Sequence, residues 1–212
     1  MVNLLMTSFF ETLQMVGISS LLSVLLGLPL AVWLAITTKG GIKENACAYG
    51  LSSLLVNAAR SIPYIILMIL MMPLTRLLVG STIGVGAATV PLTLAGILLF
   101  ARLAEDALKQ IDQGLIEVGL ASGATTSQII KSILLPEALP SIMSSTTTVI
   151  INLIGFSAMA GAVGGGGLGD LAIRYGYQRY ELELLFYIVV ILIALVQLVQ
   201  MLGNYLVKKV TK

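Results

Sequence analysis

The sequence has no histidine, a single cysteine and few charged residues. Without histidine it lacks the commonest zinc ligand and the side chain best suited to proton transfer near neutral pH. The lone Cys47 excludes an intrachain disulfide and a thiolate metal cluster. These absences disfavour most classes of enzyme and predict no cofactor or metal in this chain. The basic residues are dispersed, which argues against a nucleic-acid partner.

Charge is scarce because hydrophobic residues dominate the chain. Of the 212 residues, 58% are hydrophobic and 10% are charged, whereas an ordinary soluble domain has about 25% charged residues. The mean hydropathy is +1.02. Such a chain lacks the polar surface that a water-soluble protein needs, so the composition predicts a protein embedded in membrane lipid.

Five segments are apolar enough to cross a bilayer as helices, which takes about 20 residues each. Leu13–Ile36 and Leu184–Val207 contain no charge, and Leu51–Leu74 is apolar except for Arg60. Glu11, rather than basic residues, precedes the first segment, so we expect a retained span and not a cleaved signal peptide. The sequence predicts an all-α integral membrane protein with one transmembrane domain over residues 1–212. Its spans are expected at 13–36, 51–74, 82–101, 141–161 and 184–207.

The distribution of basic residues predicts the orientation, because cytoplasmic segments are enriched in Lys and Arg. With the N-terminus outside, the inner segments hold nine basic residues: Lys39, Lys43, Arg60, Arg102, Lys109, Lys131, Lys208, Lys209 and Lys212. The outer segments then hold three: Arg76, Arg174 and Arg179. We therefore expect the N-terminus outside and the C-terminus inside. Arg60 is then expected at the inner end of the second span, as an interfacial anchor or, alternatively, as part of a pathway or gate.

Residues 102–140 form the one large polar segment, which the orientation places in the cytoplasm. Leu108, Ile111 and Leu115 recur at helical spacing and predict a short amphipathic helix. Gly123 can end that helix in the left-handed conformation. From this pattern alone, the segment is either a plain connector or a docking element for a cytoplasmic protein.

A second short helix is expected directly after this turn. Thr125 and Gln128 form a capping-box pattern, with Thr125 as the N-cap. We expect the helix to stop at Pro136 and Pro140 to open the next span in its first turn. The segment is thus predicted to be two short helices joined by a sharp turn.

The same loop carries a longer pattern. Glu117 is followed at the sixth position by Gly123. Nine further residues then precede Ile133, with Leu135 and Pro136 after it. This spacing resembles the EAA motif of the transmembrane subunits of ABC importers, with Val118 and Gly119 in place of the two alanines. Four further segments resemble, more specifically, the transmembrane subunits of methionine ABC importers. They are Arg60–Pro63, Val90–Thr93, Leu134–Pro140 and Gly155–Tyr180, and the likeness covers Thr12–Lys209.

The resemblance implies a function and a set of partners. Such subunits form a homodimer of five-span chains in the bacterial inner membrane, carried on two copies of an ABC ATPase and supplied by a substrate-binding lipoprotein outside. The loop would be the coupling helix, and ATP with Mg would be bound by the ATPase. This chain has no Gly-x4-Gly-Lys-Ser/Thr phosphate loop of its own. The resemblance implies an ATPase contact at Glu117, Ala121, Ser122, Gly123, Ala124, Thr125, Ile133, Leu135 and Pro136.

The fourth span is the most polar of the five, with hydroxyl residues from Ser144 onward. Small polar residues permit close helix packing, so this span is read as a dimer interface, a pathway wall, or both, since a symmetric pathway runs along the two-fold axis. Asn152 and Ser157 are among the small polar residues of this span. The resemblance implies that Phe156 and Met159 lie at the constriction. Met68, Met71 and Met72 are read as a core or lipid-facing stripe rather than as substrate ligands.

Six glycines lie between residues 161 and 169. No Lys-Ser/Thr follows, so a phosphate cradle is disfavoured, and we expect an outer loop or half-helix that meets the binding protein or shapes the gate. The outer-loop set is Gly164, Gly165, Gly166, Gly167 and Gly169. Gly167–Asp170 also matches the Gly-x-Gly-Asp pattern of intramembrane aspartyl proteases, but that chemistry needs a second aspartate, and no predicted span holds one.

The expected function is thus import of an amino acid, in the first place L- and D-methionine, by alternating access coupled to a separate ATPase. Another small amino-acid-like solute is the alternative substrate. A stand-alone secondary transporter is disfavoured because the sequence predicts no charged residue in the middle of a span. For the same reason, selectivity is expected to lie mostly in the binding protein.

Overall fold

A computed structural model of the chain describes residues 2–211, and every regular element within that range is a helix. Lys212, which the orientation argument places inside, lies outside the described residues. Long apolar helices form the bundle: α1 (Val2–Thr37), α5 (Val85–Lys109), α8 (Leu135–Gly161) and α10 (Leu182–Val210). Each is long and apolar enough to cross a membrane. These helices confirm the predicted all-α membrane fold.

The second predicted span is not one straight helix. α2 (Ala46–Arg60) and α3 (Tyr64–Leu70) meet at an angle of 100°, and counting this bent pair as one span gives five. Pro63 explains the break, because proline lacks an amide hydrogen and disfavours helical backbone at the residue before it. Arg60 therefore ends α2 far from the α1–α2 loop, and its predicted place at the inner end of the span is wrong.

Small residues allow the central helices to pack closely. α1 lies along α5, where the Ser23 hydroxyl donates to the carbonyl of Thr93 at 3.3 Å. A Cβ on Gly96 would lie 2.1 Å from the Ser23 Oγ, and one on Gly203 of α10 would lie 2.2 Å from the Thr147 Oγ1 of α8. Such contacts between small and hydroxyl residues are typical of membrane helices, since lipid supplies no hydrophobic drive for association.

The polar segment forms α6 (Gln113–Ala121) and α7 (Thr126–Ile129). α5 continues to Lys109, and the Asp112 side chain then caps α6 by accepting from the Gly114 amide at 2.8 Å. Leu108 consequently lies on α5, Ile111 in the link and Leu115 on α6, so the single amphipathic helix predicted from these three residues is wrong. The cap at Asp112 separates the two helices.

The helix that begins at α7 does not stop at Pro136. It passes through a π-helical turn, η1 (Ile130–Leu134), into α8, and Thr126–Gly161 is one helix of 36 residues. In the wide turn the Leu135 amide donates to the Ile130 carbonyl, five residues back. Proline clashes with the carbonyl four residues before it, and we attribute the tolerance of Pro136 to this extra residue per turn, since π-bulges occur inside α-helices, often at functional sites.

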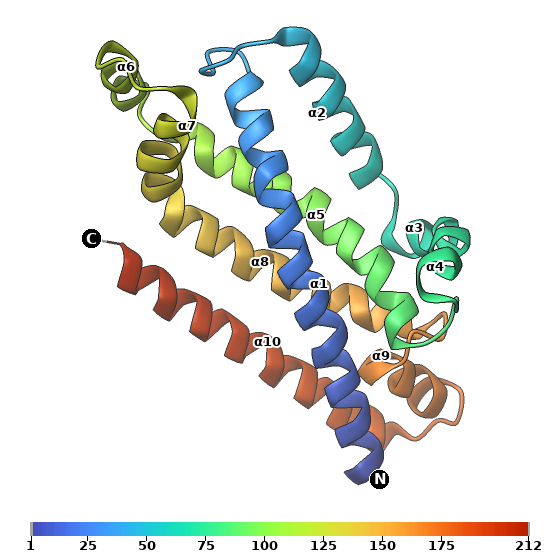
Figure 1. The fold of residues 1–212 in the computed structure, drawn as a ribbon. Helices are drawn as coiled ribbons and strands as arrows, with labels where there is room; N and C mark the ends of the chain where they lie inside the picture. Colours follow the sequence, from blue (N-terminus) through green and yellow to red (C-terminus); the bar gives the residue numbers. More distant parts are fainter. Residues whose placement is uncertain (1, 212) are drawn as a thin grey trace.

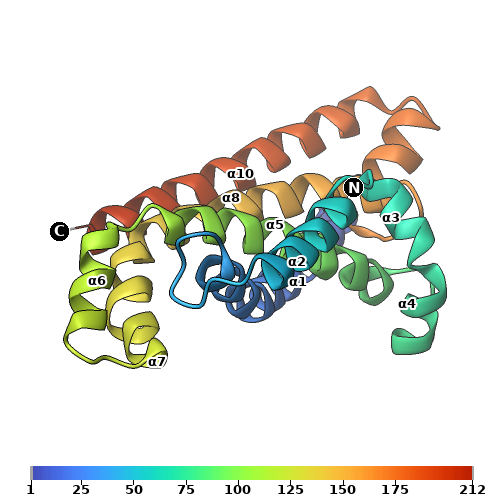
Figure 2. The same ribbon diagram turned by 90° about the horizontal axis from the view of Figure 1, so that it is seen from above.

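The two ends of the bundle carry different elements (Figure 1). α6, α7, the α1–α2 loop and the C-terminus lie at one end, and α6 and α7 project from the bundle there (Figure 2). The N-terminus lies at the other end with α4 (Met72–Val79), α9 (Gly167–Leu171) and the π-helical η2 (Ala172–Tyr177). The predicted coupling loop and the predicted outer loop are thus at opposite ends.

Candidate functional site

The turn between α6 and α7 has the predicted geometry. Gly123 has φ +77°, and the next amide, of Ala124, donates to the Gly119 carbonyl at 3.1 Å. Thr125 then caps α7: its hydroxyl accepts from the Gln128 amide, and the Gln128 side chain accepts from the Thr125 amide at 2.8 Å. A left-handed residue followed directly by a capping box fixes the angle between two helices without a long loop.

Gly119 holds α6 against the helix that follows. A Cβ at this position would lie 2.9 Å from the Ile133 Cδ1 and 3.4 Å from the Ile129 Cγ1. Ile129 is fully buried and Ile116 of α6 is nearly so. Gly119, which stands where the EAA motif has its second alanine, therefore lies at a contact between helices. A smaller residue permits closer packing there. The two helices of the hairpin are therefore packed together as one unit.

The tip of this hairpin is open. Glu117, Ala121, Ser122, Gly123 and Thr125 are exposed, while Ala124 and Ile133 are half-buried. Leu135 is half-buried and Pro136 exposed at the start of α8. Apolar side chains are exposed beside them: Leu115 is 45% exposed, Val118 66% and Leu120 48%. Apolar side chains gathered on a projecting polar element indicate a surface that a partner covers.

Part of the predicted gate set shares one face of α8. Asn152, Phe156 and Met159 follow one another at helical spacing; Asn152 is exposed and Met159 is 50% exposed. Phe156 stacks on Tyr64 of α3, with ring centroids 4.7 Å apart and an angle of 8° between the planes. Ser157 is different: it is 2% exposed and its hydroxyl donates to the Ile154 carbonyl. The structure places it in the core, away from the other three.

A cavity of about 210 Å³ opens beside this face, at the break between α2 and α3. Its lining includes Arg60 and Tyr64 from the break, Asn152 and Phe156 from α8, and Leu98 from α5. Arg60 lies near the middle of the bent α2–α3 pair, Ala46–Leu70, which counts as one candidate span. The expectation that no charged residue lies in the middle of a span is therefore wrong. Pro63 is the sequence signal for this position of Arg60, because it indicates where the span breaks.

The glycine segment forms a structured, partly buried turn. Gly164, Gly166 and Gly167 have positive φ, while Gly165 and Gly169 have none. Two side chains of α1 cap the start of α9: Glu11 accepts from the Gly167 amide at 2.7 Å, and the Thr12 hydroxyl accepts from the Leu168 amide at 2.9 Å. The segment is a half-helix anchored to α1 and packed against α8.

The protease alternative receives no support from the geometry. Asp170 pairs with Arg174 on the next turn of the same helix. Asp106 and Asp112 belong to α5 and to the cap of α6, at the opposite end of the bundle. Asp170 of the Gly-x-Gly-Asp pattern therefore has no second aspartate beside it with which to share a proton, as aspartyl protease chemistry requires.

The structure contains a buried ionic cluster that the sequence did not predict. Glu105 of α5 is 0% exposed and pairs with Arg102 at 2.7 Å and with Lys109. The Tyr49 hydroxyl of α2 donates to the Glu105 Oε1 at 3.1 Å, and Lys109 lies 4.8 Å from the centre of the Tyr49 ring. Since Tyr49 and Glu105 are 56 residues apart, helical spacing within α5 gives no sign of this tether between α2 and α5.

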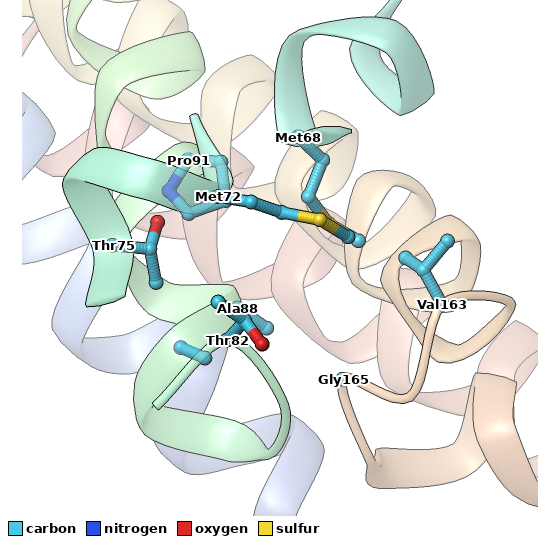
Figure 3. Close-up of a pocket in the computed structure, with 9 residues that line it drawn as sticks. Met68, Met72, Thr75, Thr82, Ala88, Pro91, Val163 and Gly165 are labelled. Carbon is cyan, nitrogen blue, oxygen red and sulfur yellow. The ribbon is translucent and has the colours of Figure 1, made fainter. Parts of the chain in front are cut away.

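A second, much smaller cavity lies between α4, α5 and the glycine segment (Figure 3). Its volume is about 10 Å³, which suits a single water molecule and not an amino acid. Met68 and Met72 reach toward it opposite Val163. Met68 and Met71 are 7% and 8% exposed, so of the two expected positions, core or lipid-facing, these two methionines lie in the core.

Similar proteins cover the whole chain. A protein from Vibrio cholerae named probable D-methionine transport system permease protein MetI is 47% identical over 208 residues, which is 98% of this chain and 92% of that protein. The Escherichia coli K12 protein named D-methionine transport system permease protein MetI is 46% identical over 161 residues, 76% of this chain and 74% of its own length.

Solved structures agree with these relatives. A chain of the MetNI methionine ABC transporter, in a structure described as inward-facing, superposes with a TM-score of 0.98 at 45% identity, covering 100% of this chain and 98% of that chain. An amino-acid ABC transporter solved with histidines has a TM-score of 0.80 at 17% identity over 98% of this chain and 94% of its own, and shows the fold alone. The family model described as binding-protein-dependent transport system inner membrane component matches residues 3–212. The chain therefore belongs to the family of inner membrane components of binding-protein-dependent transport systems, multi-pass permease subunits without catalytic activity of their own.

Proposed function

We propose that this chain is the transmembrane subunit of an ATP-driven importer that carries L- and D-methionine across the bacterial inner membrane. Two copies of the chain would form the pathway, two copies of a separate ABC ATPase would bind ATP and Mg, and a binding lipoprotein would deliver the substrate. The relatives named for D-methionine transport support the substrate. The observation that carries the proposal is the projecting EAA hairpin with Gly123 at its turn.

The hairpin is joined to the pathway by one helix. The helix that begins at Thr126 beside the turn continues to Gly161 and carries Asn152, Phe156 and Met159 on the way. When ATP draws the two ATPases together, the seated hairpins move with them. Because each hairpin is packed as a unit at Gly119, the motion reaches α8 as a rigid-body shift and opens the pathway outward.

The exposed face of α8 is assigned to the two-fold axis of the pair. Met159 is 50% exposed in the single chain, and a second copy facing it would bring the two side chains together at a constriction. Phe156, held by its stack on Tyr64, would stand beside it. At the other end of the bundle, the glycine half-helix would lie under the docked binding protein, where its anchoring to Glu11 and Thr12 keeps it in place.

The coupling turn provides a direct test. Gly123→Val places a branched side chain at a positive φ, which costs about 1–2 kcal/mol and changes the angle between α6 and α7. Gly40→Val is the matched control, since Gly40 also has φ +77° and an added Cβ meets nothing within 4 Å at either position. Transport by the reconstituted complex should fall at least about tenfold per ATP hydrolysed in the Gly123 variant. The Gly40 variant should stay coupled.

Equal coupling in the two variants would count against the assignment of the hairpin to the ATPase. A complementary measurement is co-purification: the Gly40 variant should retain the ATPase, whereas the Gly123 variant should lose it or bind it weakly. A bulkier variant, Ala121→Trp, adds volume on the exposed face of α6 and is expected to block ATPase binding without backbone strain.

A further inference from the structure

The cavity at the α2–α3 break is lined by a cation, Arg60, whose residue is exposed in the single chain. Within residues 2–211 the side chain of Arg60 makes no ion pair and no hydrogen bond, and all three ion pairs lie elsewhere. Charged residues at membrane depth are costly and mark substrate or ion pathways. Arginine suits a carboxylate in particular, because its planar guanidinium can donate two parallel hydrogen bonds.

Asn152 of α8, which also lines the cavity, offers an acceptor. The Asn152 Nδ2 donates to the Thr148 carbonyl at 2.8 Å, so its amide oxygen is the group left for a ligand. No other hydrogen bond of this side chain occurs within the described part of the chain. An ammonium group needs such an acceptor. Arg60 and Asn152 thus present a donor for a carboxylate and an acceptor for an amine in one cavity.

The rest of the lining is apolar. Tyr64 and Phe156 form a stacked pair, and Leu67, Leu98 and Leu99 complete the wall. The volume, about 210 Å³, is below the roughly 300–1,000 Å³ of pockets for drug-sized ligands and suits a small solute. A flexible thioether packs well against aromatic rings, since sulfur contacts with ring edges are favourable.

We propose that this cavity binds the transported amino acid, with Arg60 holding its α-carboxylate, Asn152 accepting from its ammonium group and the aromatic pair contacting its side chain. The inference rests on the proposed transport function and adds a site within the permease to it. A lipid phosphate is the other anion available to Arg60. The cavity favours the amino acid, because it lies at the bend between α2 and α3, near the middle of that candidate span, and pairs the cation with an amide acceptor.

Binding of labelled L-methionine to the purified complex of permease and ATPase, without binding protein, tests the site. Methionine bound by the ATPase alone is measured separately and subtracted. Arg60→Gln should weaken binding about tenfold or more, and Arg60→Lys should recover part of the loss. Arg76→Gln is the matched control, because Arg76 is exposed as Arg60 is, but lies in α4 and does not line the cavity. It should bind as the parent does.

The decarboxylated analogue 3-(methylthio)propylamine separates a carboxylate contact from a structural effect. It should compete poorly with methionine in the parent complex, and the difference between the two ligands should vanish in Arg60→Gln. Equal affinity in the parent, Arg60→Gln and Arg76→Gln complexes would overturn the inference, as would the absence of saturable binding to the permease. Loss of bound anionic lipid in Arg60→Gln with unchanged methionine affinity would assign the arginine to lipid and overturn it too. Methionine transport by the parent complex in any of these cases would leave the proposed function standing.

Discussion

At the scale of single residues, backbone contacts at small side chains position the functional elements. Gly161 of α8 and Gly169 of α9 allow two backbones to touch, since a Cβ on Gly169 would lie 2.3 Å from the Ala158 carbonyl oxygen. Main-chain atoms cannot rotate out of the way as a flexible side chain can. The glycine-rich composition of this segment therefore follows from packing between α8 and α9, and no ligand is needed to explain it.

Gly169→Ala should consequently destabilise the protein. Overpacking of this kind costs about 1–3 kcal/mol, and thermal unfolding of the purified protein in detergent measures it as a lower midpoint. Gly17→Ala is the control: an added Cβ there meets nothing within 4 Å, and alanine is favoured over glycine in a helix by about 0.5–1 kcal/mol. Equal midpoints for the two variants would show that the α8–α9 contact is looser than described.

At the scale of elements, a buried charge cluster ties α2 to α5. Glu105 is fully buried, yet its partners Arg102 and Lys109 keep 25% and 30% of their side-chain surface exposed. The tether fixes the start of α2, the helix whose other end carries Arg60. Glu105→Gln should cost about 1–3 kcal/mol of stability, because two cations lose their partner.

Asp106→Asn is the neighbouring control for this prediction. Asp106 follows Glu105 directly but is exposed. Its substitution should change the free energy of unfolding by less than about 0.5 kcal/mol. Thermal unfolding of both variants in the same detergent measures the contrast. If Asp106→Asn destabilised the protein as much as Glu105→Gln, general charge balance rather than the tether would be responsible.

Sequence patterns predicted the local features well and the long-range ones poorly. The left-handed Gly123 and the capping box at Thr125 depend on neighbouring residues only, and both are observed. Hydropathy over 51–74 predicts a span there, but neither it nor Pro63 gives the 100° angle of the break after Arg60. The continuation through Pro136 depends on a π-helical turn that no residue pattern specifies. The Tyr49–Glu105 contact and the cavity at Arg60 require the tertiary fold.

At the scale of the whole molecule, the two ends of the bundle must lie on opposite sides of the membrane. Cys47 is the one cysteine and is exposed at the start of α2, near the end that carries α6 and α7. The predicted orientation places it in the cytoplasm. A membrane-impermeant maleimide should therefore label Cys47 in inside-out vesicles and not in intact spheroplasts.

Gln178→Cys in a Cys47→Ala background provides the reverse probe. Gln178 is exposed at the end that carries α9 and η2, so it should be labelled in spheroplasts and protected in inside-out vesicles. The same labelling pattern for both probes would contradict the arrangement of the two ends, and exchange of the two patterns would reverse the orientation.

The proposed function requires that this chain moves methionine only as part of an ATP-driven assembly. The most direct test is uptake of labelled L- and D-methionine by vesicles that contain the chain, its ATPase and its binding protein, with other amino acids as competitors. We expect uptake that requires ATP and both partners and that unlabelled methionine suppresses most strongly. Methionine uptake by the chain alone would contradict the proposed function. ATP-driven uptake of another amino acid without uptake of methionine would contradict it too.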